Sequence, residues 1–360
     1  MTLISVAERT TDTAALEYSA VAFRSIAIVI PCFQVAPHIA EVIRSIPQRY
    51  RTIICVDDCS RDGTADVIAQ VADARVTLIR HRRNRGVGGA VKTGYLEALR
   101  RGAEICVKMD GDGQMRGEDL DDLVAPLVEG TADYAKGNRF VDLRALHRMP
   151  KARLVGNALL SFASKLASGY WNMLDVNNGF TAIRSAALRR MEFGRLSERY
   201  FFETSMLIEL NILRSVVADV EMPARYGSEQ SSLRASRVLL TFPGLLVRGV
   251  LRRFYWRYLI EDFGVTSVCV LTGLPLAAFG VAFGAMHWIA SIRTGRPATA
   301  GTVLLAALPV ILGFQLLLAA VLLDVVTSTA RKRHRRGTSR PESDVECSLP
   351  RALQRDSGLL

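Results

Sequence analysis

Four aspartates, arranged in two pairs, are the residues whose type and spacing most clearly predict chemistry. Each pair directly follows a short apolar run: Asp57 and Asp58 follow residues 52–56, and Asp110 and Asp112 follow residues 105–109. Hard divalent cations prefer oxygen ligands, and Mg²⁺ usually takes one or two protein carboxylates together with substrate phosphates. The pair at Asp110 and Asp112 therefore predicts a divalent-cation site.

A glycine-rich segment at residues 85–93 looks like a phosphate-binding loop but matches none of the usual patterns. A Walker A loop needs glycine immediately before its Lys-Thr pair, and Val91 stands there. The dinucleotide-binding pattern fails at the same residue. We interpret the segment as the mostly structural start of a helix, with Asn84 and Gly86 near a nucleotide as a minor alternative. A nucleotide-hydrolysing module that uses Lys92 stays open as a second hypothesis.

Basic residues gather just before an apolar helix that is expected at residues 154–166. They are Arg139, Arg144, Arg148, Lys151 and Arg153. Guanidinium groups match phosphate oxygens with two parallel hydrogen bonds, so a basic cluster near a cation site and a membrane could hold an anionic headgroup. Arg139 and Arg153 are the best candidates. The alternative is an ordinary solvated surface.

The N-terminal two thirds of the chain alternate apolar strands with helices. Strands are predicted at residues 26–30, 52–56, 76–79, 105–109 and 132–136, and helices at residues 39–45, 64–72 and 88–101. Continuous apolar strands that alternate with helices predict an α/β fold with a doubly wound, mostly parallel sheet. In such folds ligands bind outside the carboxyl ends of the strands. We therefore expect the two aspartate pairs to meet along one edge of the sheet.

Two long apolar runs occupy the C-terminal third. Residues 264–292 and 297–323 contain no Asp, Glu, Lys or Arg. Each run exceeds the roughly 20 residues needed to cross a bilayer core about 30 Å thick. We expect two transmembrane helices joined by a short turn, and not two buried helices of a soluble domain. Asp324, at the end of the second run, is assigned no role.

Basic residues flank the two spans and predict their orientation. Residues 234–262 contain six arginines and residues 331–336 five basic residues, whereas the turn between the spans has only Arg293 and Arg296. The positive-inside rule then places the N-terminal region and the tail in the cytoplasm, so the predicted location is the cytoplasmic (inner) membrane. Residues 239–263 mix aromatic residues with arginines, which is typical of a helix lying among anionic lipid headgroups.

Composition excludes several other classes of protein. Of the 360 residues 49% are hydrophobic, which excludes a disordered chain. Six cysteines are too few for a disulfide scaffold, and they repeat no zinc-ligand spacing. The net charge of +11 could indicate a nucleic-acid partner, but residues 1–233 hold 30 basic and 28 acidic residues. Most of the excess flanks the spans, so no nucleic-acid partner is expected.

Five motifs occur in the order found in a known enzyme family. They are Ile28-Val29-Ile30-Pro31-Cys32-Phe33, Val56-Asp57-Asp58-Cys59-Ser60-Arg61-Asp62-Gly63-Thr64, Asn84-Arg85-Gly86, Asp110-Gly111-Asp112-Gly113-Gln114 and Gly137-Asn138-Arg139. On these motifs, residues 24–225 resemble a family 2 glycosyltransferase with the GT-A fold. The chain is most similar to the branch of dolichol-phosphate mannosyltransferases and bactoprenol glucosyltransferases, in which a two-helix C-terminal anchor also occurs. The resemblance implies transfer of a sugar from a nucleotide-diphosphate sugar donor to a polyprenyl phosphate acceptor.

The resemblance also implies roles for individual residues. Nucleotide-sugar contacts are implied for Pro31, Cys32, Asp57, Asp58, Asn84 and Asp110. A cation, Mg²⁺ or Mn²⁺, is implied at Asp110, Asp112 and Gln114. Contacts with the acceptor phosphate are implied for Arg139, Arg153 and Lys151, and Asn178-Gly179-Phe180 resembles a segment on the acceptor side. The catalytic candidates are Asp110, Asp112 and Glu203, with a helix-surface role as the alternative for Glu203.

Two departures from the family bear on the substrates. Family members often carry a glutamate shortly after the first-strand proline, but Cys32-Phe33-Gln34-Val35 contains no acid, so the nucleobase is not assigned. The Q-x-x-R-W motif of processive polysaccharide synthases is absent from the sequence. A single transfer is therefore the favoured reaction.

The implied reaction needs no strong general base. A lipid phosphate is already anionic at neutral pH, and the five histidines show no triad-like context in the sequence. Direct attack on the anomeric carbon predicts inversion of configuration. A third hypothesis is a non-catalytic membrane scaffold or nucleotide-binding module that retains the fold. Homo-oligomerisation is compatible with the sequence.

The expected organisation has six segments. They are a polar N-terminal lead-in without signal-peptide features at residues 1–23, a glycosyltransferase domain at 24–233, an interfacial basic segment at 234–263, transmembrane helices at 264–292 and 297–326, and a basic, disordered cytoplasmic tail at 327–360.

Overall fold

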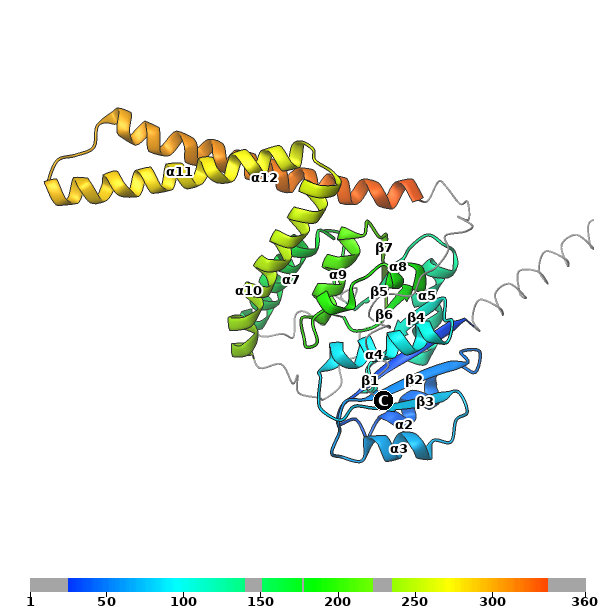
Figure 1. Cartoon of the computed structure of the whole chain (residues 1–360). Helices are drawn as coiled ribbons and strands as arrows, with labels where there is room; N and C mark the ends of the chain where they lie inside the picture. The colour runs from blue at the N-terminus through cyan, green and yellow to red at the C-terminus, as the bar shows by residue number, and fades with distance from the viewer. Residues whose placement is uncertain (1–24, 140–150, 177, 223–234, 336–360) are drawn as a thin grey trace, which may run out of the picture. The chain divides into compact units, whose positions relative to one another are not determined.

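The computed structural model describes residues 25–139, 151–176, 178–222 and 235–335. The chain divides into two compact units, with the border between Gly249 and Val250. The first unit contains a β-sheet and the helices around it, and the second, Val250–Arg333, contains two long helices (Figure 1). The predicted N-terminal lead-in, residues 1–23, lies outside the described residues.

A seven-stranded sheet forms the centre of the first unit, with strand order β3-β2-β1-β4-β6-β5-β7. The strands are β1 (Ile26–Cys32), β2 (Thr52–Asp57), β3 (Val76–Arg80), β4 (Ile105–Lys108), β5 (Tyr134–Asn138), β6 (Thr181–Arg184) and β7 (Val217–Glu221). All neighbouring strands pair in parallel except β6, which runs antiparallel to both β4 and β5. The predicted α/β fold with a mostly parallel sheet is confirmed.

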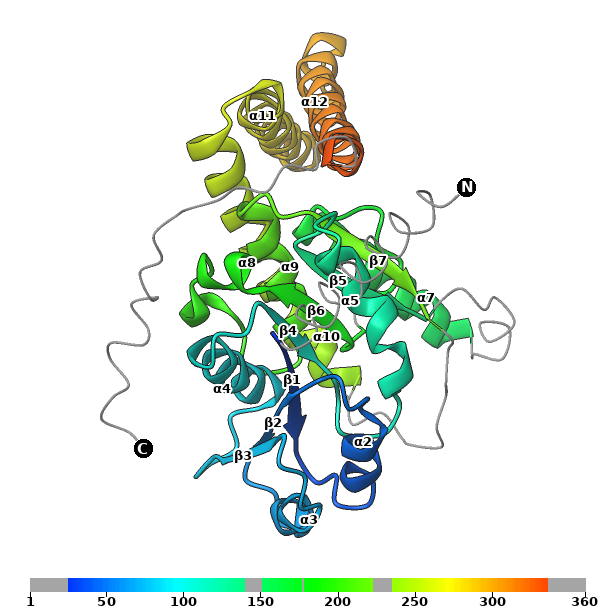
Figure 2. The ribbon, with the colours of Figure 1, turned by 90° about the vertical axis from the view of Figure 1, so that its right-hand side faces the viewer.

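Helices cover both faces of this sheet, and each face has its own buried hydrophobic cluster (Figure 2). One face carries α4 (Val87–Arg100), α8 (Ser185–Arg189) and α9 (Phe202–Ile212), and the other carries α2 (Ile39–Ser45), α3 (Thr64–Gln70) and α5 (Leu120–Val128). Side chains of β1 alternate between the two clusters: Ala27 and Val29 face the first, and Ile28 and Ile30 the second. A strand buried on both sides is apolar at every position, which explains the continuous runs in the sequence.

The first strand continues past the proline at which the sequence pattern predicts its end. Residues of a parallel strand hydrogen bond alternately to the neighbours on its two sides, and Val29 O accepts the Met109 N–H on the β4 side. Pro31 faces that same side, where β4 has already ended at Lys108. Its missing N–H therefore removes no ladder bond, and β1 pairs with β2 as far as Cys32.

Strand β6 lies between two lysines on the neighbouring strands. Thr181 is the partner of Lys108 in β4 and also of Lys136 in β5. Directly opposite residues of antiparallel strands project from the same face, so both lysine side chains share one face of the sheet. Both are buried, with 1% and 0% of their surface exposed.

The remaining elements of the first unit are α7, most of α10 and two short turns. Helix α7 (Lys151–Ser168) packs against α9, and the short turns η1 (Gly117–Asp119) and η2 (Phe193–Arg195) precede α5 and follow α8. Helix α10 (Ala235–Phe254) leads into a π-helical segment, η3 (Tyr255–Glu261). The predicted interfacial segment is thus helical over almost its whole length.

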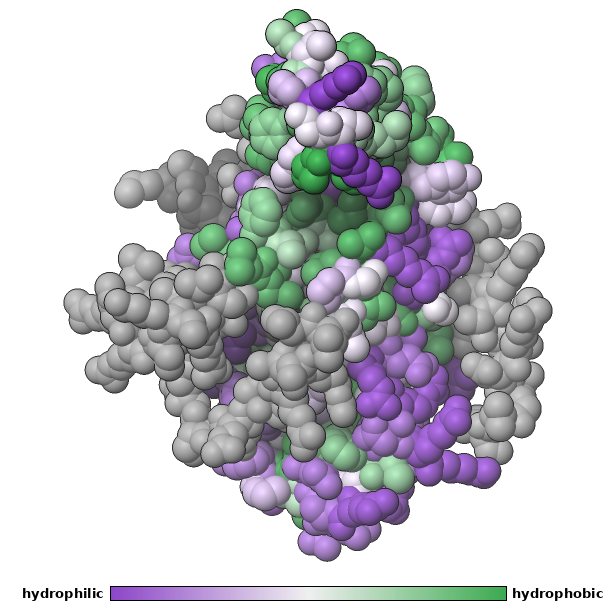
Figure 3. All heavy atoms as spheres, turned by 90° about the vertical axis from the view of Figure 1, so that its left-hand side faces the viewer, coloured by the Kyte–Doolittle hydropathy of each residue, from purple (hydrophilic) through white to green (hydrophobic). Residues whose placement is uncertain are grey.

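Two long helices, α11 (Val265–Thr294) and α12 (Ala300–Arg335), dominate the second unit. Residues 265–294 and 300–327 are long and apolar enough to cross a membrane, and only 17% of either hydrophobic window is buried. Large side chains such as Leu274 and Phe314 are exposed, and the top of Figure 3 shows this hydrophobic surface in green. A core helix of a soluble domain would bury such residues, so the exposure supports two lipid-facing spans.

Glycines bring the two long helices close together. A Cβ added to Gly280 would lie 2.7 Å from Ala306 O, and one added to Gly313 would lie 2.7 Å from Gly273 O. Small residues at such positions allow membrane helices to approach backbone to backbone. Helix α12 also continues to Arg335, beyond the predicted border at residue 326, because the polar residues after the apolar run do not break a helix.

Asp324 has a role that the sequence analysis does not assign to it. Its carboxylate accepts two hydrogen bonds from the Arg253 guanidinium, at 3.1 and 3.0 Å, and one from the Tyr258 hydroxyl. Arg253 and Asp324 expose only 7% and 11% of their side chains. The segment that precedes α11 is therefore tied by an ion pair to α12.

We expect Asp324→Asn to destabilise the second unit, because it leaves the Arg253 charge without its carboxylate in a largely water-free place. Breaking a buried pair from one side typically costs about 3–5 kcal/mol. Thermal unfolding of the detergent-solubilised chain, followed by circular dichroism, measures the effect. The double variant Arg253→Met, Asp324→Leu should recover part of the loss; losses that simply add would contradict a direct pair.

Candidate active site

The predicted cation residues lie in a turn directly after β4. Asp110 follows the strand by two residues, and its carboxylate is 29% exposed. Gly113 adopts φ +80° and allows the chain to turn, so that the Gln114 N–H donates to Asp112 Oδ1 at 3.0 Å. The turn brings both carboxylates to the carboxyl end of a central strand, as the sequence predicts.

Lys108, the last residue of β4, lies beneath this turn. Its ammonium group donates to Asp110 Oδ1 at 2.8 Å and to Gly179 O at 3.1 Å, and it lies 3.1 Å from Glu203 Oε1. Burial alone would lower the pKa of Lys108, but the two carboxylates outweigh burial and raise that pKa above its usual value. Lys108 is therefore a permanent buried cation that joins three segments of the chain.

Glu203 does not lie on a helix surface, so that alternative is wrong. The residue is in the first turn of α9, only 13% of its side chain is exposed, and it shares the Lys108 ammonium with Asp110. Glu203 and the Asp110 carboxylate of the cation turn are thus held by the same buried charge. Its catalytic role stays a prediction.

The segment before β6 passes so close to Asp110 that only glycine fits. A Cβ added to Gly179 would lie 2.2 Å from Asp110 Oδ2 and 2.5 Å from Lys108 Nζ. Neighbouring Asn178 is buried, its amide nitrogen donates to Gly137 O at 2.7 Å, and its amide oxygen accepts the Phe180 N–H at 3.0 Å. The Asn178–Gly179 segment thus forms a wall against which the Asp110 carboxylate rests.

Lys136 is the second buried lysine on this face. Its ammonium group donates to Asn178 O. Burial lowers the pKa of Lys136 to about 8, although Glu203 and Asp175 act in the opposite direction. Lysine in the unfolded chain keeps its proton to about pH 10.5, so this side chain makes stability depend on pH.

We expect the wild type to gain stability relative to Lys136→Met as the pH rises from 8 to 10.5. In that window the unfolded chain binds more protons at residue 136 than the folded chain, so the free energy of unfolding increases with pH. The pKa difference corresponds to about 3 kcal/mol in total. Denaturant unfolding of both proteins at several pH values tests this, and a constant difference between them would contradict it.

Arg139 extends the site at the end of β5. Its Nε lies 2.8 Å from Asp175 Oδ2, the aspartate is almost fully buried, and 35% of the arginine side chain is exposed. The buried carboxylate holds the guanidinium group at the surface. Lys151 and Arg153 begin α7, but their side chains lie outside the described residues, as do Arg144 and Arg148.

The carboxylates of Asp57 and Asp58, at the end of β2, accept hydrogen bonds from backbone N–H groups of nearby loops. Asp57 is 2% exposed, and its carboxylate accepts the Ser60 N–H at 3.2 Å. Asp58 accepts the N–H groups of Arg85 and Gly86 at 2.9 and 2.7 Å. The contribution of both residues to nucleotide binding stays a prediction, and it would act through the loops that they hold.

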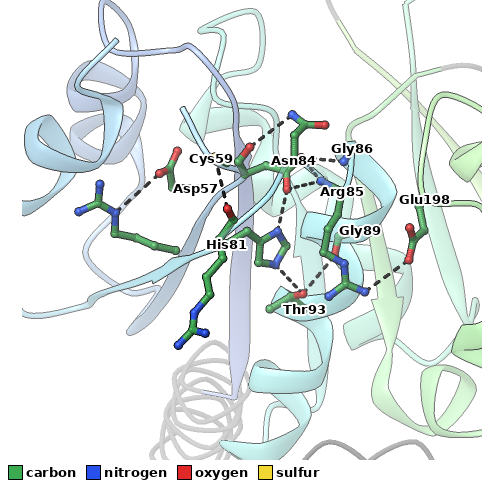
Figure 4. Close-up of polar contacts among 12 residues, drawn as sticks. Asp57, Cys59, His81, Asn84, Arg85, Gly86, Gly89, Thr93 and Glu198 are labelled. Carbon is green, nitrogen blue, oxygen red and sulfur yellow. Dashed lines mark hydrogen bonds and ion pairs between the residues drawn. The ribbon is translucent and has the colours of Figure 1, made fainter. Parts of the chain in front are cut away.

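His81 connects the Asp58 carboxylate to helix α4, and Figure 4 shows its ring beside Thr93 of that helix. Its Nδ1 lies 2.7 Å from Asp58 Oδ1 and its Nε2 2.9 Å from Thr93 Oγ1. Burial would raise the pKa of Asp58, but the hydrogen bonds from His81 and the two backbone amides outweigh burial and lower it. Asp58, His81 and Thr93 thus form a chain of hydrogen bonds that their sequence context does not reveal. The Thr93 hydroxyl donates within α4 to Gly89 O, so the array anchors the loop.

The other predicted nucleotide residues differ in exposure. Cys32 is 1% exposed and its thiol donates to Ile30 O, so this side chain cannot contact a ligand directly. Pro31 is buried, whereas Asn84 is exposed and its amide donates to Asp58 O at 3.3 Å. The loop that follows β1 is held by side chains of Ser60, Asp62 and Thr64, which accept hydrogen bonds from the N–H groups of residues 34–36.

The glycine-rich segment packs against backbone. A Cβ added to Gly88 would lie 2.2 Å from Ser197 O, and one added to Gly86, which has φ +84°, would lie 2.6 Å from Glu198 O. Lys92 exposes 9% of its side chain and lies 3.9 Å from Glu198 Oε1. The glycines thus serve close packing of α4 on the 197–198 segment, in line with the structural interpretation, and Lys92 faces a carboxylate of the protein.

The donor set fits a cation that also takes ligands from a substrate. Among the described residues, no group of three or more His, Cys, Asp and Glu side chains could hold a metal ion. The turn after β4 instead offers two carboxylates, one of them shared with Lys108. Such a partial set suits Mg²⁺ or Mn²⁺ completed by diphosphate oxygens.

Known proteins with similar sequences decide the family. The family model described as Glycosyl transferase family 2 matches residues 27–191. An uncharacterized protein of Methanocaldococcus jannaschii is 30% identical over 216 residues, 60% of this chain and 87% of that protein. The chain belongs to glycosyltransferase family 2. The sheet described above is accordingly a GT-A fold, and the chain is an enzyme of the glycosyltransferase class.

Two named relatives of this family 2 glycosyltransferase act on lipid phosphates. A UDP-N-acetylglucosamine–dolichyl-phosphate N-acetylglucosaminyltransferase of Methanococcus voltae is 28% identical, over 60% of this chain and 91% of that protein. A polyprenol monophosphomannose synthase of Mycolicibacterium smegmatis is 29% identical, over 50% of this chain and 69% of that protein. The family 2 glycosyltransferase described here is thus homologous to polyprenyl-phosphate sugar transferases.

A solved structure is similar to part of this chain at low sequence identity. The mannosyltransferase PcManGT of Pyrobaculum calidifontis, in complex with GDP-Man and Mn²⁺, is 16% identical to this family 2 glycosyltransferase. The superposition covers 84% of this chain and 86% of that chain, with a TM-score of 0.44.

Lys108, Lys136, Asp175 and His81 are site residues that sequence reasoning missed. A lysine within an apolar strand is itself a signal, because a buried ammonium group needs charged or polar partners nearby. Lys108, two residues before Asp110, carries that signal. The partners of Lys136, Asp175 and His81 come from segments whose contacts no local pattern predicts.

Proposed function

We propose that this family 2 glycosyltransferase transfers a single sugar from a nucleotide-diphosphate sugar to a polyprenyl phosphate at the cytoplasmic face of a membrane. One observation carries the proposal: Asp110 and Asp112 after β4 and Arg139 after β5 lie at the same edge of the sheet. Strands β4 and β5 are both antiparallel to β6, so their carboxyl ends point the same way. A donor diphosphate and an acceptor phosphate can therefore be held side by side.

A divalent cation, Mg²⁺ or Mn²⁺, would be held by Asp110, Asp112 and Gln114 together with the donor diphosphate. When bound, it would stabilise the negative charge that develops on the leaving nucleoside diphosphate. The protein itself orients Asp110 through Lys108 and Gly179, and Asp112 through the turn at Gly113. These contacts preorganise the carboxylates before any ligand arrives.

The acceptor side is built around Arg139. The buried Asp175 carboxylate fixes one edge of the guanidinium group, whose exposed part can bind a phosphate monoester. A phosphate oxygen is anionic at neutral pH and can attack the anomeric carbon without prior loss of a proton to the protein. One direct displacement inverts the configuration at that carbon, so retention in the product would overturn this one-step reaction.

The two long apolar helices support a lipid as the acceptor. Helices α11 and α12 are long enough to span a bilayer, and six arginines between residues 234 and 262 precede the first of them. The positive-inside rule places these arginines, the sheet-containing unit and the tail in the cytoplasm. Binding of anionic lipids to the basic flank would keep the enzyme at the surface where polyprenyl phosphate is found.

Transfer from a panel of UDP- and GDP-sugars to polyprenyl phosphate, with Mg²⁺, Mn²⁺ or EDTA, tests the proposal. We expect one donor to give a lipid-linked monosaccharide of inverted configuration, and EDTA to abolish the reaction. Hydrolysis of nucleotide without transfer, lost in Lys92→Ala, would favour the nucleotide-hydrolysing alternative. Complementation of a deletion strain by Asp112→Asn would favour a non-catalytic scaffold.

A further inference from the structure

Lys108 places one buried positive charge between Asp110, a residue of the proposed cation site, and the carboxylate of Glu203. Its three ammonium protons match three acceptors at 2.8, 3.1 and 3.1 Å: Asp110 Oδ1, Glu203 Oε1 and Gly179 O. Only 1% of the lysine is exposed, so the ammonium group does not contact a ligand itself. Its influence on ligands is exerted through its charge and through the carboxylates that it holds.

This charge changes the electrostatics of the cation site. Asp110, Asp112 and Glu203 together carry a charge of −3, and Lys108 reduces it to −2. It also engages one oxygen of Asp110 and one of Glu203, so these two carboxylates and Asp112 do not form a ready-made cluster of three metal ligands. A divalent cation alone is consequently attracted less strongly than the number of nearby carboxylates would suggest.

We propose, building on the proposed function, that Lys108 is a positioning residue that makes cation binding depend on the donor diphosphate. The cation site that it leaves is incomplete, and the oxygens of a nucleoside diphosphate complete it. The cation and the diphosphate then bind as a unit, each strengthening the other by the same factor. The enzyme would thereby avoid holding a cation in the absence of donor.

Manganese binding to the full-length chain in detergent at pH 7, measured by electron paramagnetic resonance of free Mn²⁺, tests this inference. The titration is run with Mn²⁺ alone and with UDP or GDP added. For the wild type we expect either UDP or GDP to strengthen Mn²⁺ binding at least about tenfold. Lys108→Met should bind Mn²⁺ alone at least about tenfold more tightly than the wild type, because a unit charge buried beside Asp110 repels a dication more strongly than the same charge would in water. The strengthening by the diphosphate should fall below about threefold in this variant.

Lys92→Met is the matched control. Lys92 is another largely buried lysine, with 9% of its side chain exposed, and its ammonium group lies 3.9 Å from Glu198 Oε1. Because its carboxylate partner is Glu198 and not Asp110, we expect its replacement to change the affinity for Mn²⁺ alone by less than about threefold. A shift as large as that of Lys108→Met would mean that any buried charge has this effect, and would overturn the proposal.

Two further variants keep the test decisive if Lys108→Met does not fold. Lys108→Arg retains the charge and should bind Mn²⁺ alone as weakly as the wild type. Glu203→Gln removes a negative charge from the same cluster and should weaken binding of Mn²⁺ alone by about tenfold. Unchanged or weaker binding of Mn²⁺ alone in Lys108→Met, or unchanged binding in Glu203→Gln, would overturn the proposal.

The same preparations separate this inference from the proposed function. Coupled binding of Mn²⁺ and diphosphate by a wild type that transfers no sugar to polyprenyl phosphate would remove the proposed acceptor and leave the role of Lys108 intact. Sugar transfer that persists in EDTA, with no Mn²⁺ binding under any condition, would overturn the role of Lys108 and leave the transfer reaction standing.

Discussion

Asp112→Asn is expected to lower the rate of sugar transfer to polyprenyl phosphate by at least about a thousandfold, with membrane insertion unchanged. The substitution removes a charge that would hold the cation, and electrostatic stabilisation of the leaving diphosphate supplies several kcal/mol of the rate enhancement. Asparagine keeps an Oδ1 that can accept the Gln114 N–H, as Asp112 does at 3.0 Å, so the turn after β4 should persist. Initial rates with purified protein and fractionation of cell membranes measure the two effects.

Asp122→Asn provides the comparison, because Asp122 is an exposed aspartate on α5 that follows the same turn. It should retain transfer within about twofold of the wild type, as expected for a surface substitution away from the site. Transfer by Asp112→Asn within tenfold of the wild type would contradict the assignment of Asp112 as a cation ligand.

Gly179→Ala is the second substitution for which we expect a large effect, with transfer reduced at least about a hundredfold. The new methyl group would lie 2.2 Å from Asp110 Oδ2 and 2.5 Å from Lys108 Nζ, so either the carboxylate or the segment before β6 must move. A displacement of about 1 Å at a reacting centre can cost a factor of this size. Rates, Mn²⁺ affinity in the presence of diphosphate and thermal unfolding should be measured on the same samples.

Gly194→Ala is the matched control for the added methyl group. Gly194 lies in η2, and a Cβ there would have no atom within 4 Å. We expect wild-type transfer and cation binding from this variant. If Gly179→Ala retained both, the contact between the Asn178–Gly179 segment and Asp110 would have no part in the site.

Periodicity predicts most of the fold because strands buried on both faces and amphipathic helices leave local signals. The runs at β1, β2, β3 and β4 and the helices between them are visible in the sequence. Strand β6 leaves a weaker signal, because Thr181 and Arg184 leave it only two apolar residues, Ala182 and Ile183. Its antiparallel direction depends on pairing with β4 and β5, which no local pattern encodes.

The residues of the candidate site were likewise predicted only where they leave a local signal in the sequence. Asp110 and Asp112 were predicted because they follow a strand end, where a parallel sheet collects functional side chains, and Arg139 because it belongs to a basic cluster near the expected cation site. The partners that hold them were not predicted. Glu203 reaches Lys108 from a helix 95 positions later in the chain, and Asp175 reaches Arg139 from 36 positions later. Such contacts arise from tertiary packing. The residues around each motif predict only the strand or helix that contains it, and not its distant partners.

Strand β6 also has a consequence for the order in which the enzyme folds. The loops around Asp58 close over 23 to 28 residues of chain, so they can form early, together with β1, β2 and α4. The contact from Lys108 to Gly179 closes over 71 residues, and such long closures form late because their entropic cost precedes the stabilising contacts. A folding intermediate with an ordered nucleotide-side half would therefore still lack the wall behind Asp110. Synthesis must also reach α9, Phe202–Ile212, before Glu203 can contact Lys108.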